Sequence, residues 1–247
     1  MIQLIKSGLP EIQPLRERFL DENKIQFIYN KCYENAWADS WMFRIEGEIA
    51  GYGSIWGADR REERDAIFEF YLTAPYRSLA NRIFAKLITE SGARLIECQS
   101  NDPLLTSMLY EYSQNINAEA ILFADDRQTD LWAARATFGR EPGAANTGND
   151  VAGFFLKQND VPVATGGFML NYNWPYADIY MEVNEHFRQK GFGSLIVQEL
   201  KREIYRMGRV PAARCNISNH ASKATLLKAG FKVCGAVLKG DIKQESR

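Results

Sequence analysis

Histidine and cysteine are scarce in this chain of 247 residues. It has two histidines and four cysteines, and the cysteines are far apart, without the close pairs that bind metals. We therefore expect no metal site built from these residues. The wide spacing of the cysteines favours a reduced, cytoplasmic compartment.

Long apolar runs and an excess of one charge are missing as well. No unbroken apolar stretch approaches the ~20 residues of a membrane span, and the first residues lack the pattern of a signal peptide. We therefore expect no membrane association. Thirty basic and thirty-one acidic residues leave a net charge of −1, so nucleic acid is not expected as a partner. The sequence does not indicate an oligomeric state.

What is present is a weak internal repeat in a chain that is 46% hydrophobic. Each half has, in the same order, a predicted hairpin, a strand, a helix and another strand. Alignment of Arg77 with Arg188 brings the preceding strands into register, and a slightly larger offset pairs Asn101 with Asn219. We interpret this as a tandem duplication. The predicted elements cover 41–55, 66–72, 79–88 and 95–98 in the first half, and 152–169, 176–183, 195–204 and 213–216 in the second.

The boundary between the halves is predicted between Phe123 and Thr129, where an apolar run gives way to acidic residues. This gives domains of residues 1–125 and 126–247. A breaker-rich stretch at 140–148 is expected to be a loop beside the substrate cleft. Before the first hairpin, the pattern predicts a short strand at 2–5 and then helical spacing that runs on to Ile28.

The informative segment of the second half is read as a strand, a loop and a helix start over 180–194. It contains the spacing Arg188-x-x-Gly191-x-Gly193. A loop that enters a helix exposes unpaired backbone N–H groups, and glycine lets this backbone approach an anion closely. Side chains at either glycine are expected to stand where phosphate oxygens must lie, so the segment suits a pyrophosphate.

This motif resembles the coenzyme A signature of the GNAT superfamily of N-acyltransferases. A second block, from Asn219 to Gly230 and Phe231, resembles the family's Asn-initiated helix that ends in Gly-Phe. The resemblance covers roughly residues 151–240, and the first half is similar only in layout. It implies an α+β (mixed α/β) fold with tandem GNAT units, the N-terminal copy degenerate, each a mostly antiparallel mixed sheet flanked by helices.

The resemblance also implies which residues bind acetyl-coenzyme A. The strand before the loop holds the pantetheine arm through its backbone, and the loop and the two helix starts hold the phosphates and their surroundings. The implied residues are Met181, Val183, Arg188, Gln189, Lys190, Gly191, Phe192, Gly193, Ser194, Asn219 and Ser222.

Each of these features also has a purely structural interpretation. Gly191 and Gly193 can permit a tight strand-to-helix turn, and Asn219 can be an N-cap. Gly230 can end a helix, with a packed aromatic residue behind it. Arg188 can be a solvated surface charge.

Acyl transfer to an amine needs a base, a polarised carbonyl and a proton for the leaving thiolate. Glu182 is the first candidate base, directly or through water, and Asp178 is the second, since both side chains leave one face of the strand. Tyr180 lies between them and can line the acceptor pocket. The backbone from Met181 to Val183 is the candidate oxyanion donor.

One position departs from the family pattern. Many members carry a tyrosine seven residues after the block's asparagine, as general acid, and this chain has Leu226 there. Water or Ser222 is left to protonate the thiolate. The sequence therefore leaves two candidate functions: an N-acetyltransferase acting on a small-molecule or peptide amine, and a non-catalytic acyl-coenzyme A-binding or interaction protein. A dinucleotide-dependent oxidoreductase is disfavoured, since the Gly-x-Gly-x-x-Gly order is missing.

The first half is expected to bind no coenzyme A. The Arg77–Arg188 alignment places Ala80 opposite Gly191 and Arg82 opposite Gly193, so the loop lacks both glycines. An arginine side chain at that point should block a pyrophosphate. Aromatic residues of this half can wall the acceptor cleft or belong to the core; they are Trp37, Trp41 and Trp56.

Overall fold

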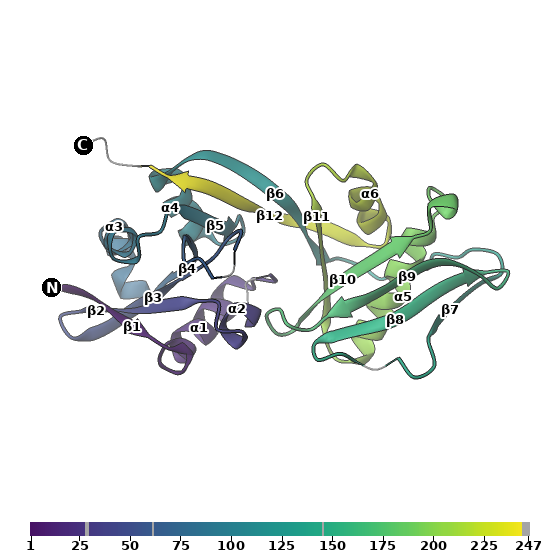
Figure 1. Cartoon of the computed structure of the whole chain (residues 1–247), viewed down its shortest axis with the longest axis horizontal. Helices are drawn as coiled ribbons and strands as arrows, with labels where there is room; N and C mark the ends of the chain where they lie inside the picture. Colours follow the sequence, from purple (N-terminus) through teal and green to yellow (C-terminus); the bar gives the residue numbers. More distant parts are fainter. Residues whose placement is uncertain (28–29, 61, 145, 244–247) are drawn as a thin grey trace. The chain divides into compact units, whose positions relative to one another are not determined.

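The computed structural model describes residues 1–27, 30–60, 62–144 and 146–243. The chain divides into two compact units, Met1–Glu119 with Ala236–Arg247 and Ala120–Gly235, whose elements are labelled in Figure 1. Each unit is a mixed sheet with helices packed on it. This confirms the predicted α+β (mixed α/β) class with two similar units.

The first unit has the strand order β1, β2, β3, β4, β5, β12. Neighbouring strands are antiparallel except β4 and β5, which run parallel. Its elements are β1 (Ile2–Ser7), α1 (Leu9–Asn23), α2 (Asn30–Glu34), β2 (Asp39–Ile45), β3 (Glu48–Trp56), β4 (Ala66–Leu72), the 3-10 helix η1 (Ala74–Leu79), α3 (Ala80–Ser91), β5 (Leu95–Gln99), α4 (Pro103–Tyr112), the start of β6 (Ser113–Asp125) and the end of β12 (Phe231–Ile242).

Both faces of β4 are covered, which explains why all of its residues are apolar or buried. Phe68 packs into a cluster with residues of α1, while Phe70 and Leu72 pack into a second cluster with residues of α3 and α4. Trp41 and Trp56 belong to these cores. We conclude that these two tryptophans are core residues, and Trp37 packs partly buried against the α1 cluster.

The second unit has the strand order β6, β11, β10, β9, β8, β7, with β10 and β11 parallel and the other neighbouring pairs antiparallel. The apolar face of α5 packs against the strands in one core. Its elements are the end of β6, β7 (Ala136–Arg140), β8 (Asp150–Gln158), β9 (Val161–Met169), β10 (Tyr176–Val183), the 3-10 helix η2 (Glu185–Phe187), α5 (Phe192–Arg206), β11 (Val210–Asn216), α6 (His220–Lys228) and the start of β12.

In both units the parallel pair separates early. β4 pairs with β5 only at its first two residues, and β10 pairs with β11 only as far as Asp178, which lies opposite Ala212. The rest of β10 therefore has one free edge, because β9 continues beside its other edge to Val183. This open wedge is the place where a ligand can meet the backbone of β10.

The division of the chain differs from the boundary expected at residues 125 and 126. β6 pairs with β11 from Ala120 to Ala124 and so belongs to the second unit there. β12 pairs with β5 from Val237 to Asp241, so the end of the chain completes the first unit. The strand returns to β5 through pairing that is remote in sequence, and residue patterns do not specify such a partner.

Two other local expectations can be compared with the structure. The first helix ends at Asn23, because Lys24 adopts a left-handed conformation with φ of 47°, so the helical spacing beyond this point does not correspond to helix; Ile28 lies outside the described residues. In the stretch 140–148, Glu141 to Asn149 contains turns, and Ala145 lies outside the described residues. No helix in the described ranges has both the length and the apolar character of a membrane span.

Candidate functional site

The strand-loop-helix segment of the second unit opens on an uncapped helix. Gly191 stands just before α5 with φ of +87°, and no side chain caps the helix there. The first helical hydrogen bond runs from Leu195 N to Gly191 O at 3.1 Å, so the N–H groups of the first turn precede the helical ladder. These donors, together with the positive end of the helix dipole, form an anion site.

The two glycines of the motif have different physical roles. Space beside Gly191 is open apart from Lys228 Nζ, which lies 3.6 Å from the point where a Cβ would stand, so its positive φ is what requires glycine. Gly193 is buried, and a Cβ there meets Thr225 Cγ2 at 3.1 Å. This glycine therefore also allows α5 to pack closely on α6, a packing role that the sequence did not indicate.

Arg188 has a structural contact that recurs in the first unit. Its Nε donates to Val183 O at 3.3 Å, and Arg77 Nε donates to Leu72 O at 3.2 Å. The repeated contact supports the Arg77–Arg188 alignment in three dimensions. Arg77 also pairs with Glu22, whereas within the described chain no carboxylate forms such a pair with Arg188. The Arg188 guanidinium can therefore meet an anion.

The second sequence block, which starts at Asn219, begins helix α6 beside the start of α5. Asn219 is its N-cap, and the Asn219 Oδ1 accepts from Ser222 N at 2.9 Å. Between this helix start and β10 lies a groove of about 770 Å³. Its lining includes ten of the predicted cofactor residues: Met181, Val183, Arg188, Gln189, Gly191, Phe192, Gly193, Ser194, Asn219 and Ser222.

Two positions in this region differ from the sequence interpretation. Lys190 is not part of the groove lining; its Nζ donates to His186 O at 3.2 Å and lies over the Phe187 ring. Lys228, at the end of α6, lines the groove instead. The sequence block contains Lys228, but its spacing does not reveal that the side chain reaches back over Gly191.

The free edge of β10 directs particular backbone groups into the wedge. Asn184 N donates to Val163 O of β9 at 2.9 Å. Because backbone direction alternates along a strand, the N–H groups of Met181 and Val183 point the other way, toward the wedge. This is the backbone expected to hold the pantetheine arm and to polarise the acyl carbonyl.

A smaller cavity of about 380 Å³ adjoins the groove, and the two share Met181 and Ser222 in their linings. Glu182 is exposed and lines the groove, whereas Asp178 is buried and lines the smaller cavity. The structure thus divides the two candidate bases between neighbouring spaces. Leu226 also lines the smaller cavity, buried, so it brings no hydroxyl to the thiolate.

Polar partners that the sequence did not indicate surround Asp178. Arg214 Nε lies 3.5 Å from Asp178 Oδ2, and the same guanidinium donates to the Tyr172 hydroxyl. The Tyr180 hydroxyl donates to Asp150 Oδ1 at 2.6 Å. Burial, this hydrogen bond and the Asp150 charge raise the pKa of Tyr180 well above its usual value, so Tyr180 stays protonated at neutral pH. Among the described residues, no group of three or more metal-ligating side chains is close enough to hold a metal ion.

The loop of the first unit is shorter than the alignment assumed. The buried helix residues Ile83 and Leu87 match Ile196 and Leu200, and each leucine packs over a strand glycine, Leu87 Cδ2 on Gly53 and Leu200 Cδ1 on Gly166. The helices thus match at an offset two residues larger than that of Arg77 and Arg188.

This register changes the comparison of the loops. Ala80 lies opposite Gly193 rather than opposite Gly191, and Arg82 does not lie opposite Gly193. The expectation that Arg82 blocks a pyrophosphate is therefore wrong. The first unit instead lacks two loop residues and has no counterpart of Gly191: its helix is preceded by Leu79, with φ of −99°.

The N-caps correct one further pairing. Asp102 caps α4 in the first unit, and its Oδ1 accepts from Leu105 N at 3.1 Å, as Asn219 does for α6. Asn219 therefore corresponds to Asp102 and not to Asn101. At this position the first unit has a carboxylate where the second unit has a neutral amide.

Sequence comparison matches both units to family models. Residues 9–126 match an acetyltransferase (GNAT) domain, and residues 174–237 match the model described as FR47-like protein. The chain belongs to the GNAT superfamily of acyltransferases, with two GNAT-type units in tandem. The first half is thus similar to the family in sequence and not only in layout. A search of curated proteins finds no match.

Solved structures with the same fold cover nearly the whole chain. An acetyltransferase of the GNAT family from Colwellia psychrerythraea aligns with a TM-score of 0.73 at 14% identity, covering 98% of this chain and 100% of that one. A GCN5-related N-acetyltransferase from Sphaerobacter thermophilus aligns with a TM-score of 0.64 at 11% identity, over 98% and 96%. A tandem GNAT protein from the clavulanic acid biosynthesis pathway gives 0.63 at 9% identity, over all of both chains.

Proposed function

We propose that the second unit is an N-acyltransferase that transfers an acetyl group from acetyl-coenzyme A to a small-molecule or peptide amine. The observation that carries this proposal is the groove between the free edge of β10 and α6, where the uncapped start of α5 meets Gly191, Arg188 and Lys228. Backbone donors and two cations at one end of a groove suit a pyrophosphate.

The residues present fit the rest of the molecule as well. The backbone of Met181 and Val183 offers hydrogen bonds to a pantetheine arm along the wedge, and Phe187, which is partly exposed, supplies apolar contact area. The shared lining residues Met181 and Ser222 connect the groove to the smaller cavity. An acyl group held at this connection lies within reach of both candidate bases.

When bound, acetyl-coenzyme A supplies an activated acyl group as a thioester. The Met181 or Val183 N–H polarises the carbonyl oxygen, because these donors are already directed into the wedge. Glu182, through water, accepts the proton that the amine loses as its C–N bond forms. Ser222 or water would supply the proton that balances the charge of the leaving thiolate when the C–S bond breaks.

Asp178 and Arg214 are suited to a different task. Their contact at 3.5 Å ties the carboxylate to a guanidinium on the neighbouring strand. The pair, with Tyr180 and its hydrogen bond to Asp150, forms one wall of the smaller cavity. We assign this wall to binding and orienting the acceptor.

The second candidate function is a non-catalytic acyl-coenzyme A-binding protein, and Leu226 favours it. This residue stands buried at the position where many family members have a tyrosine, next to the expected thiolate. Thiol release from acetyl-coenzyme A, measured with a panel of small amines and N-terminal peptides, separates the two functions. Release that saturates with an amine supports the enzyme; saturable binding of coenzyme A with no amine-dependent release supports the binding protein.

A further inference from the structure

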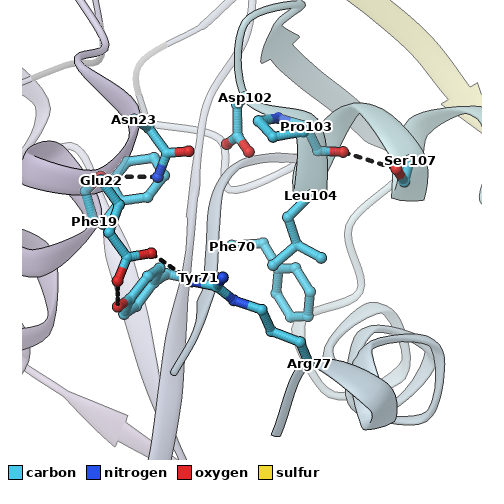
Figure 2. Close-up of a pocket in the computed structure, with 10 residues that line it drawn as sticks. All are labelled: Phe19, Glu22, Asn23, Phe70, Tyr71, Arg77, Asp102, Pro103, Leu104 and Ser107. Atoms are coloured by element: carbon cyan, nitrogen blue, oxygen red, sulfur yellow. Dashed lines mark hydrogen bonds and ion pairs between the residues drawn. The ribbon is translucent and has the colours of Figure 1, made fainter. Parts of the chain in front are cut away.

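The first unit has a cavity of about 590 Å³ that is not part of the proposed acyltransferase site (Figure 2). It lies between the end of α1, β4, η1 and the start of α4. In the first unit these elements stand where β10, the phosphate loop and the start of α6 stand in the second. The cavity and the groove thus occupy corresponding places in two copies of one fold.

The cavity has apolar walls and an acidic polar lining. Pro103 and Leu104 of α4 provide apolar surface at the cavity, and Phe19 and Phe70, which are 1% and 0% exposed, lie buried behind its wall. Glu22 is already neutralised, since it accepts from the Tyr71 hydroxyl at 2.8 Å and pairs with Arg77. Arg77 is therefore occupied, unlike Arg188 in the second unit.

Asp102 is the group without a counterion. Its side chain is 1% exposed, and Figure 2 shows its carboxylate directed into the space between α1 and α4. Oδ1 accepts from Leu105 N, but Oδ2 has no hydrogen-bond partner among the described residues. Burial raises the pKa of Asp102 to about 7, although the backbone N–H groups of Leu105 and Leu104 act to lower it. A buried carboxylate without a cation is costly, so the site is incomplete as the chain alone builds it.

We propose that this cavity binds a small primary ammonium ion with an apolar chain. The ammonium group donates to Asp102 Oδ2, and the chain packs on Pro103 and Leu104. In this proposal the first unit binds a cation where the second unit binds an anion, and Asp102 stands at the position of Asn219.

The proposed ammonium site uses only residues of the first unit and stands whether or not the second unit transfers acyl groups. The probe is n-butylammonium, titrated at about pH 8 into the full chain with its leucine methyl groups labelled for NMR. Leu104 lines the cavity, and Leu226 reports any separate binding near Asp178 in the second unit. We expect saturable shifts of the Leu104 methyl signals with butylammonium and none at equal concentrations of n-butanol or butyrate.

Asp102→Asn is the matched variant, because asparagine caps a helix as well as aspartate and is the residue found at this place in α6. It should weaken butylammonium binding at least about tenfold while the α4 resonances stay in place. Ser107→Trp fills the cavity from its exposed side and should abolish the Leu104 shifts without touching the core.

Binding should also weaken below about pH 7, where Asp102 takes up a proton; the other titratable groups near it are Glu22 on α1, Glu69 and Tyr71 on β4, Cys98 on β5 and Arg77 on η1. Three results would overturn the proposal. They are no Leu104 shift with the unaltered chain, equal shifts with n-butanol, and unchanged affinity in Asp102→Asn.

Discussion

Gly191 and Gly208 form a matched pair for testing the phosphate loop. Both have positive φ, +87° and +68°, and neither is crowded by a neighbouring backbone. Valine at either position should lower the free energy of unfolding by a similar amount, about 1–2 kcal/mol. Only Gly191→Val should abolish coenzyme A binding in calorimetry, because only this residue lines the groove. Equal affinity of the two variants would show that Gly191 serves folding alone.

Glu182 can be separated from Asp178 by the pH dependence of turnover. Glu182→Gln should lower kcat about 100-fold and remove the acidic limb of the pH profile, with coenzyme A affinity nearly unchanged, because the side chain is exposed beside the groove. Asp178→Asn should mainly raise the KM for the amine, since it breaks the contact with Arg214. Loss of the acidic limb in Asp178→Asn alone would reverse these roles.

Asp102 predicts an unusual pH dependence of stability for the first unit. Its pKa is raised from 3.8 to about 7 by burial, so the folded state holds the proton more tightly than the unfolded chain. The contribution of Asp102 to stability is therefore fully present below about pH 4 and is lost as the pH rises to about 8, by up to about 4 kcal/mol. Urea unfolding of the unaltered chain and of Asp102→Asn, without amine, measures this. The variant should lack the Asp102 contribution, and identical pH profiles would contradict it.

The buried polar network of the first unit ties α1 to two strands. Glu69 on β4 is fully buried and accepts from Arg16 of α1 and from the Tyr33 and Tyr52 hydroxyls, at 2.6 and 2.7 Å for the latter two. Burial and the Glu69 charge raise the pKa of both tyrosines well above their usual value. All three donors therefore stay protonated and paired with one carboxylate.

Removal of this carboxylate should leave the buried Arg16 guanidinium without its counterion. We expect Glu69→Ala to destabilise the first unit by about 3–5 kcal/mol, measured by urea unfolding. Tyr52→Phe, which removes a single donor from the same carboxylate, is the control and should lose about 1 kcal/mol. Similar losses in the two variants would show that the ion pair contributes no more than one hydrogen bond.

The elements of the second unit could be predicted because their signals are local. The hairpin, β10, α5 and the N-cap Asn219 each follow from periodicity, glycine or capping residues in one short segment. The loop length in the first unit could not be predicted. The position of Arg77 sets one alignment of the two units, and the buried face of α3 sets another. Only the packing of Leu87 on Gly53 reveals the difference of two residues.

Contacts between distant segments could not be predicted from the sequence either, because they also depend on packing and not on a local pattern. The Arg214 contact with Asp178 joins β11 to β10, and Asp150 reaches Tyr180 from β8. Nothing in their local patterns distinguishes these charges from solvated surface residues. The pairing of β12 with β5 belongs to this group, since an apolar strand pattern does not name its partner.

Across the chain, two units of one fold should bind a single coenzyme A. The first unit has a shortened loop, no counterpart of Gly191 and an acidic cavity. Titration calorimetry of the intact chain should give a stoichiometry near one. A chain of residues 120–235, the bounds of the second unit, should keep the affinity. A stoichiometry near two would contradict the assignment of the site to the second unit.

Because β12 pairs with β5, truncation at the C-terminal end of the chain should affect the first unit. Ending the chain after Gly235 removes the antiparallel partner of β5, whose pairing with β12 runs from Leu95 to Gln99, and exposes one edge of β5. We expect the first unit to lose its cooperative thermal transition while coenzyme A binding persists. Hydrogen exchange of β5 amides checks this, and unchanged protection there would show that β12 is dispensable.

The same strand sets an order of events during synthesis. A ribosome makes residues 1–119 first, yet the sheet they form lacks β12 beside β5 until the residues from Ala236 onward have left the exit tunnel. The second unit has all of its own residues earlier. N-terminal domains usually finish folding first during synthesis. Here the order is reversed, because the first unit keeps an unpaired edge on β5 until after the second unit has all the residues that it needs to fold.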